Sequence, residues 1–129
     1  MISANHNKES MKNILVITLT VLGLFCGMAQ AQDNLERRKI EFLISSVENL
    51  NGAKFIRNGS EYTGKEAAEH LRMKLQKAGS KVQTADDFIR ICASASSLSG
   101  RPYMIKSSDG KVQNAAEYFR KKLTEFHQP

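Results

Sequence analysis

Apolar residues recur at intervals of three and four along the first segment after position 32. Asp33 followed by Glu36 matches the cap that opens a helix, and Asn51-Gly52 matches a helix end. Spacing of this kind places apolar side chains on one face of an amphipathic helix. The pattern therefore predicts a first helix that ends at Leu50 and buries Ile40, Leu43, Ile44, Val47 and Leu50.

Two short β-prone stretches follow, residues 54–57 and 60–62, and Asn58-Gly59 lies between them. Asn-Gly is the strongest short-range signal for a hairpin, because a type I′ turn needs two residues at positive φ. The motif Thr63-Gly64-Lys65-Glu66 then reads as a capping box. It predicts a second helix that ends at Gly79 and buries Ala67, Leu71, Leu75 and Ala78.

The same order of elements then returns. Thr84 and Asp87 predict the start of a third helix, and its expected apolar face is Phe88, Ile91, Cys92, Ala95 and Leu98. A strand at 101–106, a turn at 107–110 and a short return strand follow. The last helix begins at Asn114 and is expected to bury Ala116, Phe119, Leu123 and Phe126.

Residues 36–75 and 84–123 align without a gap, and ten of the forty aligned positions are identical. The match is strongest between Glu66–Leu75 and Asn114–Leu123. Internal repeats of this length indicate a repeated structural unit. Because a lone two-stranded hairpin is marginal in water, the two copies should share one core. We predict an α+β fold, with a duplicated helix–β-hairpin–helix unit giving four helices and two short hairpins in one small domain.

The N-terminal stretch has the features of an export signal. Lys8 and Lys12 precede a mostly apolar run at 14–25, and Ala29-Gln30-Ala31 follows. This predicts a secretory signal peptide, residues 1–31, and a single domain at 32–129 in the periplasm or outside the cell. The run is shorter than the roughly 20 residues of a membrane span. Retention as an uncleaved anchor is the alternative.

The chain carries a net charge of +6, and loss of residues 1–31 leaves 17 basic and 12 acidic residues, or +5. Cys92 is then the sole cysteine, which excludes an intramolecular disulfide. On an apolar helix face it is expected to be a small buried hydrophobe instead of a reactive thiol. His70 and His127 show no metal-ligand spacing, so we expect no metal and no cofactor.

Two segments carry candidate chemistry. The serine-rich stretch 94–103, which contains Arg101, offers hydroxyls to a polar or anionic ligand; alternatively, its serines bond nearby carbonyls. His70 follows Glu66 by four residues, a spacing that suits either a proton-transfer pair or an ordinary surface pair. No G-x-S-x-G motif supports serine hydrolysis.

Positive charge lines the two helices that close the repeats, at Arg72, Lys74, Lys77 and Lys81 in the first and at 120–122 in the second. Such surfaces attract anions, among them phospholipid headgroups, acidic glycans and polyphosphates. A merely solvated helix face is the alternative. Nucleic acid is disfavoured by export and by the lack of interleaved aromatic and basic residues.

Four stretches together suggest a family: Phe55–Gly59 with Tyr62, Glu66–Lys74, Thr84–Ile89 and Ser94–Tyr103. In order and spacing they resemble the YfeK-like family of small bacterial periplasmic proteins, over about residues 36–123. The resemblance implies export, one small α+β domain and no assigned activity. The family's recurrent polar positions fall here on Arg57, Asn58, His70, Arg72, Ser96, Ser97, Gly100 and Tyr103.

The sequence thus favours an exported, non-enzymatic module that binds a small polar or anionic ligand or a cell-envelope partner. No residue is assigned a catalytic role. The expected binding face comprises Arg57, Asn58, Tyr62, His70, Arg72, Ser96, Ser97, Arg101 and Tyr103. The alternative is an envelope hydrolase or transferase with His70 as general base. A homodimer would show instead as an exposed apolar patch on the hairpins.

Overall fold

The computed structural model describes residues 27–127 and divides the chain into two units, 1–34 and 35–129. The expected leader at 1–31 falls mainly outside the described residues. In the first unit, residues 27–34 are already helical, so no helix begins at Asp33 as predicted. Glu36 is buried; its carboxylate accepts the backbone N–H of Ala85, at the start of the third helix, at 2.8 Å and pairs with Lys39 of its own helix at 2.7 Å.

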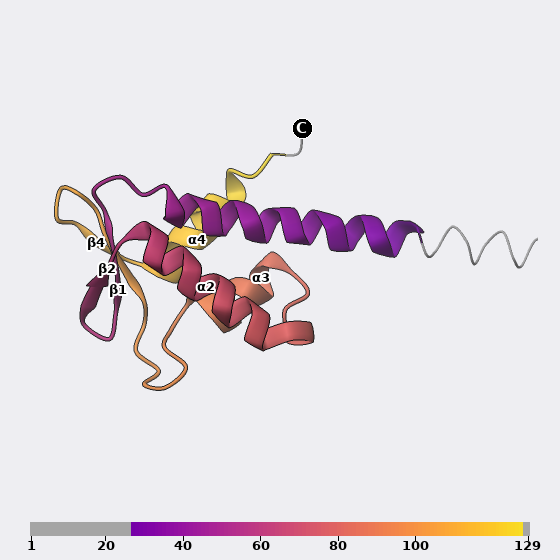
Figure 1. The fold of residues 1–129 in the computed structure, drawn as a ribbon. Coiled ribbons are helices and arrows are strands. Elements are labelled where there is room, and N and C mark those ends of the chain that lie inside the picture. The colour runs from indigo at the N-terminus through magenta and orange to yellow at the C-terminus, as the bar shows by residue number, and fades with distance from the viewer. Residues whose placement is uncertain (1–26, 128–129) are drawn as a thin grey trace, which may run out of the picture. The chain divides into compact units, whose positions relative to one another are not determined.

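Within the described residues, the second unit contains four α-helices and one four-stranded antiparallel sheet (Figure 1). Its first helix occupies residues 35–48. The remaining elements in chain order are β1 (Lys54–Arg57), β2 (Ser60–Tyr62), α2 (Gly64–Ala78), the 3₁₀ turn η1 (Gly79–Lys81), α3 (Ala85–Phe88), the π-helical η2 (Ile89–Ala93), β3 (Met104–Lys106), β4 (Val112–Asn114) and α4 (Ala115–Thr124).

Both hairpins form as expected, and they join into one sheet of order β2-β1-β3-β4. In the first hairpin Arg57 pairs with Ser60, while Asn58 and Gly59 have φ values of 50° and 80°, as a type I′ turn requires. The two inner strands are antiparallel, with Phe55 opposite Ile105. Alternation along the strands therefore turns Phe55 and Ile105 toward the helices, where each is only 1% exposed.

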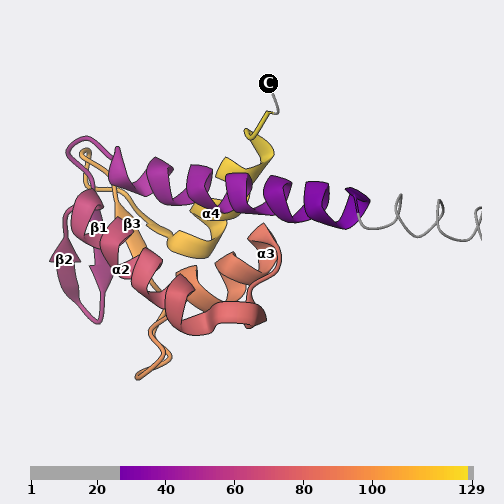
Figure 2. The same cartoon turned by 45° about the vertical axis from the view of Figure 1, so that its right-hand side comes forward.

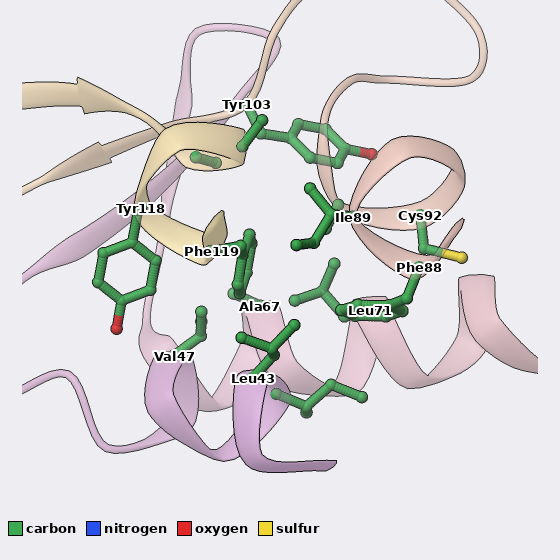
Figure 3. Packing of buried hydrophobic residues seen from close by; sticks show 14 of the residues in the cluster. Leu43, Val47, Ala67, Leu71, Phe88, Ile89, Cys92, Tyr103, Tyr118 and Phe119 are labelled. Atoms are coloured by element: carbon green, nitrogen blue, oxygen red, sulfur yellow. The ribbon is translucent and has the colours of Figure 1, made fainter. Parts of the chain in front are cut away.

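Helices cover that face of the sheet and enclose a single core (Figure 2). Both predicted capping boxes are present, at Thr63–Glu66 and Thr84–Asp87, and Asn114 caps α4. Figure 3 shows Leu43, Leu71, Phe88 and Phe119 converging in the interior. The α+β class and the two hairpins are thus confirmed.

The third helix is shorter than predicted. It widens into the π-helical η2 and ends at Ala93, where the Ser94 hydroxyl donates to the Ile89 carbonyl. Ala95 then bridges to Pro102, and the chain forms a loop, residues 94–101, instead of more helix. The prediction that Leu98 is buried is therefore wrong, since its side chain is 99% exposed.

The last helix also ends early, at Thr124. Phe126, predicted to be buried on it, lies beyond the helix and is half-buried, with its ring 5.4 Å from that of Phe42. No helix in the described part of the chain is long and apolar enough to cross a membrane.

Candidate functional site

The site begins where β1 ends beside α2. Arg57 follows Phe55 by two positions, so its side chain leaves the sheet on the helix-covered face, at the sheet's end. Its Nη1 lies 2.8 Å from Nδ1 and 3.1 Å from Nε2 of His70 on α2. Its Nη2 donates to the Tyr62 hydroxyl at 3.2 Å, and the guanidinium carbon sits 4.8 Å from the centre of the Tyr62 ring.

The surroundings of His70 favour its neutral imidazole. A guanidinium only donates hydrogen bonds, so the contact with Arg57 requires a ring nitrogen of His70 to accept. Burial lowers the pKa of His70, and the charges of Arg57, Lys74 and Lys77 lower it further. Nδ1 is the ring nitrogen nearer to Arg57, and Nε2 also lies 3.3 Å from the Tyr103 hydroxyl.

Tyr103 connects the helix to the serine-rich loop. Its side chain is buried, and its hydroxyl accepts from Lys74 Nζ at 3.1 Å. Lys74 also donates to the Ala95 carbonyl at 2.9 Å, and its Nζ lies 4.9 Å from the centre of the Tyr103 ring. Lys74 thus lines the site, and only part of its side chain is exposed.

The loop 94–101 is tied to the first hairpin through Asn58. Asn58 Nδ2 donates to Ser96 Oγ at 3.3 Å, and Ser99 Oγ donates to Asn58 Oδ1 at 2.6 Å. Ser99 Oγ in turn accepts the backbone N–H of Arg101 at 3.2 Å. Most of these hydroxyls therefore bond within the molecule, as the local alternative for the serines anticipated.

Two adjoining pockets open on this network, and Arg57, His70 and Met73 line both. The first, of about 320 Å³, is otherwise lined by Phe55, Tyr62, Glu66, Ala67 and Glu69. The second, of about 400 Å³, is otherwise lined by Asn58, Lys74, Lys77, Ser96, Ser97, Leu98 and Tyr103. We call the second the cationic pocket, because none of the described residues that line it is acidic.

Seven of the nine predicted site residues thus come together around the two pockets: Arg57, Asn58, Tyr62, His70, Ser96, Ser97 and Tyr103. Arg72 lies outside both pockets, since its guanidinium pairs with Glu41 at 2.8 Å and Glu48 at 3.0 Å. Arg101 is exposed and also lies outside them, with Nη1 near Gly59.

The predicted set lacked Lys74 and Lys77, although the sequence carried a signal for both. They follow His70 by four and seven residues, a spacing that places all three on one face of α2. The two lysines were predicted only as part of a general basic surface, without regard to their spacing from His70.

Metal ligands and a reactive thiol are lacking at this site in the described part of the chain. Among residues 27–127, no three His, Cys, Asp or Glu side chains gather in a way that could hold a metal ion. Cys92 is buried in the core, and burial raises the pKa of its thiol. The hydroxyl within hydrogen-bond reach of His70 is that of Tyr103, which also accepts from Lys74.

Residues 34–127 match the model of a family of unknown function, DUF5329. The chain belongs to this family. It is also 32% identical over 93 residues to the uncharacterized protein YfeK of Salmonella typhimurium (strain LT2), a match that covers 72% of this chain and 77% of that protein. No solved structure matches. The YfeK-like family expected from the motifs is confirmed, and it brings no established activity to these pockets.

Proposed function

We propose that the protein is an exported, non-enzymatic module that binds a small anionic ligand in the cationic pocket. The observation that supports this most is the charge of the lining: Arg57, Lys74 and Lys77 contribute three positive groups, and no described lining residue opposes them. A hollow lined by charges of one sign concentrates counter-ions and strengthens their attraction. The expected signal peptide supports a place for this binding in the periplasm or outside the cell.

The polar groups around the charges suit an oxyanion. Ser97 and Tyr103 contribute hydroxyls to the pocket wall, and the Asn58 amide lies at its edge. Hydrogen bonds from cations and hydroxyls to anionic oxygens are the stronger kind in proteins. A phosphate or carboxylate group therefore fits this lining better than a neutral sugar or a cation.

A hydrolase or transferase with His70 as general base is the alternative. A general base needs a free acceptor nitrogen close to the nucleophile that it deprotonates. In His70, a ring nitrogen instead accepts a hydrogen bond from Arg57, and the neighbouring hydroxyl is that of the buried Tyr103. No contact in the site favours this alternative over binding.

Titration of the protein with inorganic phosphate, followed by backbone amide NMR shifts, tests the proposal. We expect saturable shifts at Ser97 and Leu98, and Lys77→Gln should weaken binding about threefold to tenfold through loss of one charged contact. Lys65→Gln is the matched control, because Lys65 lies on the same helix, is exposed and lines neither pocket.

Absence of saturable shifts, or an equal effect of the Lys65 variant, would remove the binding proposal. Turnover of an ester or phosphate ester that disappears in His70→Gln would establish the enzymatic alternative in its place.

We also infer that residues 36–75 and 84–123 arose by duplication of one unit. The order helix, strand, strand, helix occurs twice, and the sheet order β2-β1-β3-β4 is symmetric about its centre. Buried positions of α2 and α4 correspond at the predicted spacing, as Leu71 and Phe119 illustrate. The helix starts differ: α2 begins at Gly64, whereas α4 begins at Ala115, one turn later than the repeat would place it.

A further inference from the structure

The loop 94–101 projects from the molecule and is held at its base by hydrogen bonds. In Figures 1 and 2 the orange loop that precedes β3 extends away from the helices and the sheet. Its base is closed by hydrogen bonds from Ser96 N–H to the Arg101 carbonyl at 3.0 Å and from Gly100 N–H to the Ser96 carbonyl at 2.9 Å. Together with the tether to Asn58, these bonds fix which side chain the loop presents to solvent.

That side chain is Leu98, which is 99% exposed at the loop's tip. Met73 on α2 is 43% exposed and lines the cationic pocket together with Leu98. Scattered exposed leucines are ordinary, but a leucine that a pinned loop holds in solvent beside a second exposed apolar residue forms a patch. The patch adjoins the pocket that holds the three positive charges.

These groups suit an anionic membrane surface. Leu98 lines the same pocket as Lys74 and Lys77, and the exposed Arg101 ends the same loop. In a bilayer the acyl chains lie beneath a layer of phosphates. An exposed apolar side chain beside a group of cations can therefore contact both hydrocarbon and phosphate.

We propose that the protein docks on anionic phospholipid bilayers through this loop: Leu98 enters the acyl region and a lipid phosphate occupies the cationic pocket. The inference rests on the proposed function, because it names the lipid phosphate as the anion that the pocket binds. One leucine and a few cations provide weak, reversible attachment that salt reduces.

Vesicle co-sedimentation tests the docking. The protein is expressed with its natural N-terminus and purified in the form that the cells export. It is then mixed with vesicles of phosphatidylglycerol and phosphatidylcholine, or of phosphatidylcholine alone. We expect binding to the anionic vesicles, weakened on the order of tenfold in Leu98→Asn and about fivefold in Lys77→Gln. Val112→Asn is the matched control, since Val112 is 52% exposed on the edge strand β4. All variants share one N-terminus, so their differences measure the loop.

The soluble-phosphate titration separates this inference from the proposed function. Leu98→Asn should weaken vesicle binding much more than phosphate binding, because it removes an apolar side chain and no charge, whereas Lys77→Gln should lose affinity for phosphate and vesicles alike. Phosphate binding by the wild type without vesicle binding, or equal vesicle binding by Leu98→Asn, overturns the membrane inference and leaves the binding proposal standing. If the wild type binds neither phosphate nor vesicles, both the binding proposal and the membrane inference are overturned.

Discussion

His70 is the residue on which the polar contacts of the site converge. Arg57 reaches it from β1, Lys74 and Lys77 share its face of α2, and Tyr103 reaches it from the chain before β3. Each of these groups is a cation or a hydroxyl, so the surroundings favour the neutral imidazole. Protonation would place a further positive charge among three existing ones and remove the acceptor that Arg57 uses.

The lowered pKa of His70 predicts a dependence of stability on pH. Between the folded pKa and the ordinary value of 6.5, the unfolded chain binds a proton that the folded chain does not. The free energy of unfolding should therefore decrease as the pH falls through that window. His70→Gln should flatten this decrease in urea denaturation at pH 7 and pH 5. An NMR titration of the His70 ring with a midpoint at or above 6.5 would contradict the prediction.

Gly64 is the residue at which α2 passes closest to the first helix. It is buried, and a Cβ there would clash with the Val47 carbonyl oxygen and lie 3.1 Å from that of Glu48. Because the obstruction is backbone, it cannot rotate away. We expect Gly64→Ala to lower the free energy of unfolding by about 1–3 kcal/mol in urea denaturation. Lys65→Ala, one residue later and exposed, should change it by less than about 0.5 kcal/mol.

At the scale of elements, Asn58 couples the first hairpin to the loop 94–101. Asn58→Gly keeps the positive φ but removes both side-chain bonds to Ser96 and Ser99. Loss of about 1 kcal/mol of local stability should speed hydrogen exchange of the Gly100 amide roughly fivefold. The Gly110 amide, in the turn of the other hairpin, should exchange as before. Unchanged exchange at Gly100 would mean that the loop needs no tether.

Elements with local signals were predictable from the sequence. Asn58-Gly59 specified the first turn, and Thr63 and Thr84 specified two helix starts, because these residues act on backbone atoms within four positions. The predicted end of the third helix was wrong: the helix ends at Ala93, although the apolar spacing continues to Leu98. There the Ser94 side chain and the bridge between Ala95 and Pro102 compete with helical bonds, and periodicity does not record that competition.

Most residues of the site could be predicted from the sequence, but the orientation of their side chains could not. Motif resemblance placed Arg57, His70 and Tyr103 together, yet it could not distinguish an arginine that faces a pocket from Arg72, which faces Glu41 and Glu48. That difference depends on where the first helix lies against α2, which is a tertiary relation.

At the scale of the whole molecule, Arg72 joins α2 to the first helix. Its side chain is about two-fifths exposed, so water and salt screen the pairs with Glu41 and Glu48. We expect Arg72→Gln to lower the free energy of unfolding by at most about 1 kcal/mol, and the loss should shrink at high salt. Phosphate affinity should stay at the wild-type value. Weaker phosphate binding in this variant would return Arg72 to the binding face.

The two sequence halves share one interior. Phe55 from the first half packs on Tyr103 from the second with ring centres 5.2 Å apart, and the Tyr118 hydroxyl donates to the Ser46 carbonyl at 3.1 Å. The inner strands β1 and β3 pair with each other across the same boundary. Neither half can therefore bury its apolar face without the other, and the unit should unfold in one step.

Truncation at corresponding core positions tests this cooperativity. Leu71 and Phe119 occupy matching places in the two halves and are fully buried, so Leu71→Ala and Phe119→Ala should each lower the free energy of unfolding by about 3 kcal/mol. Met73→Ala, exposed on the same helix as Leu71, should change it by less than about 0.5 kcal/mol. In urea, circular dichroism and amide NMR signals from both halves should follow one transition. If, in Phe119→Ala, the helical signals of the first half persist to higher urea concentration than those of the second half, each half has a core of its own.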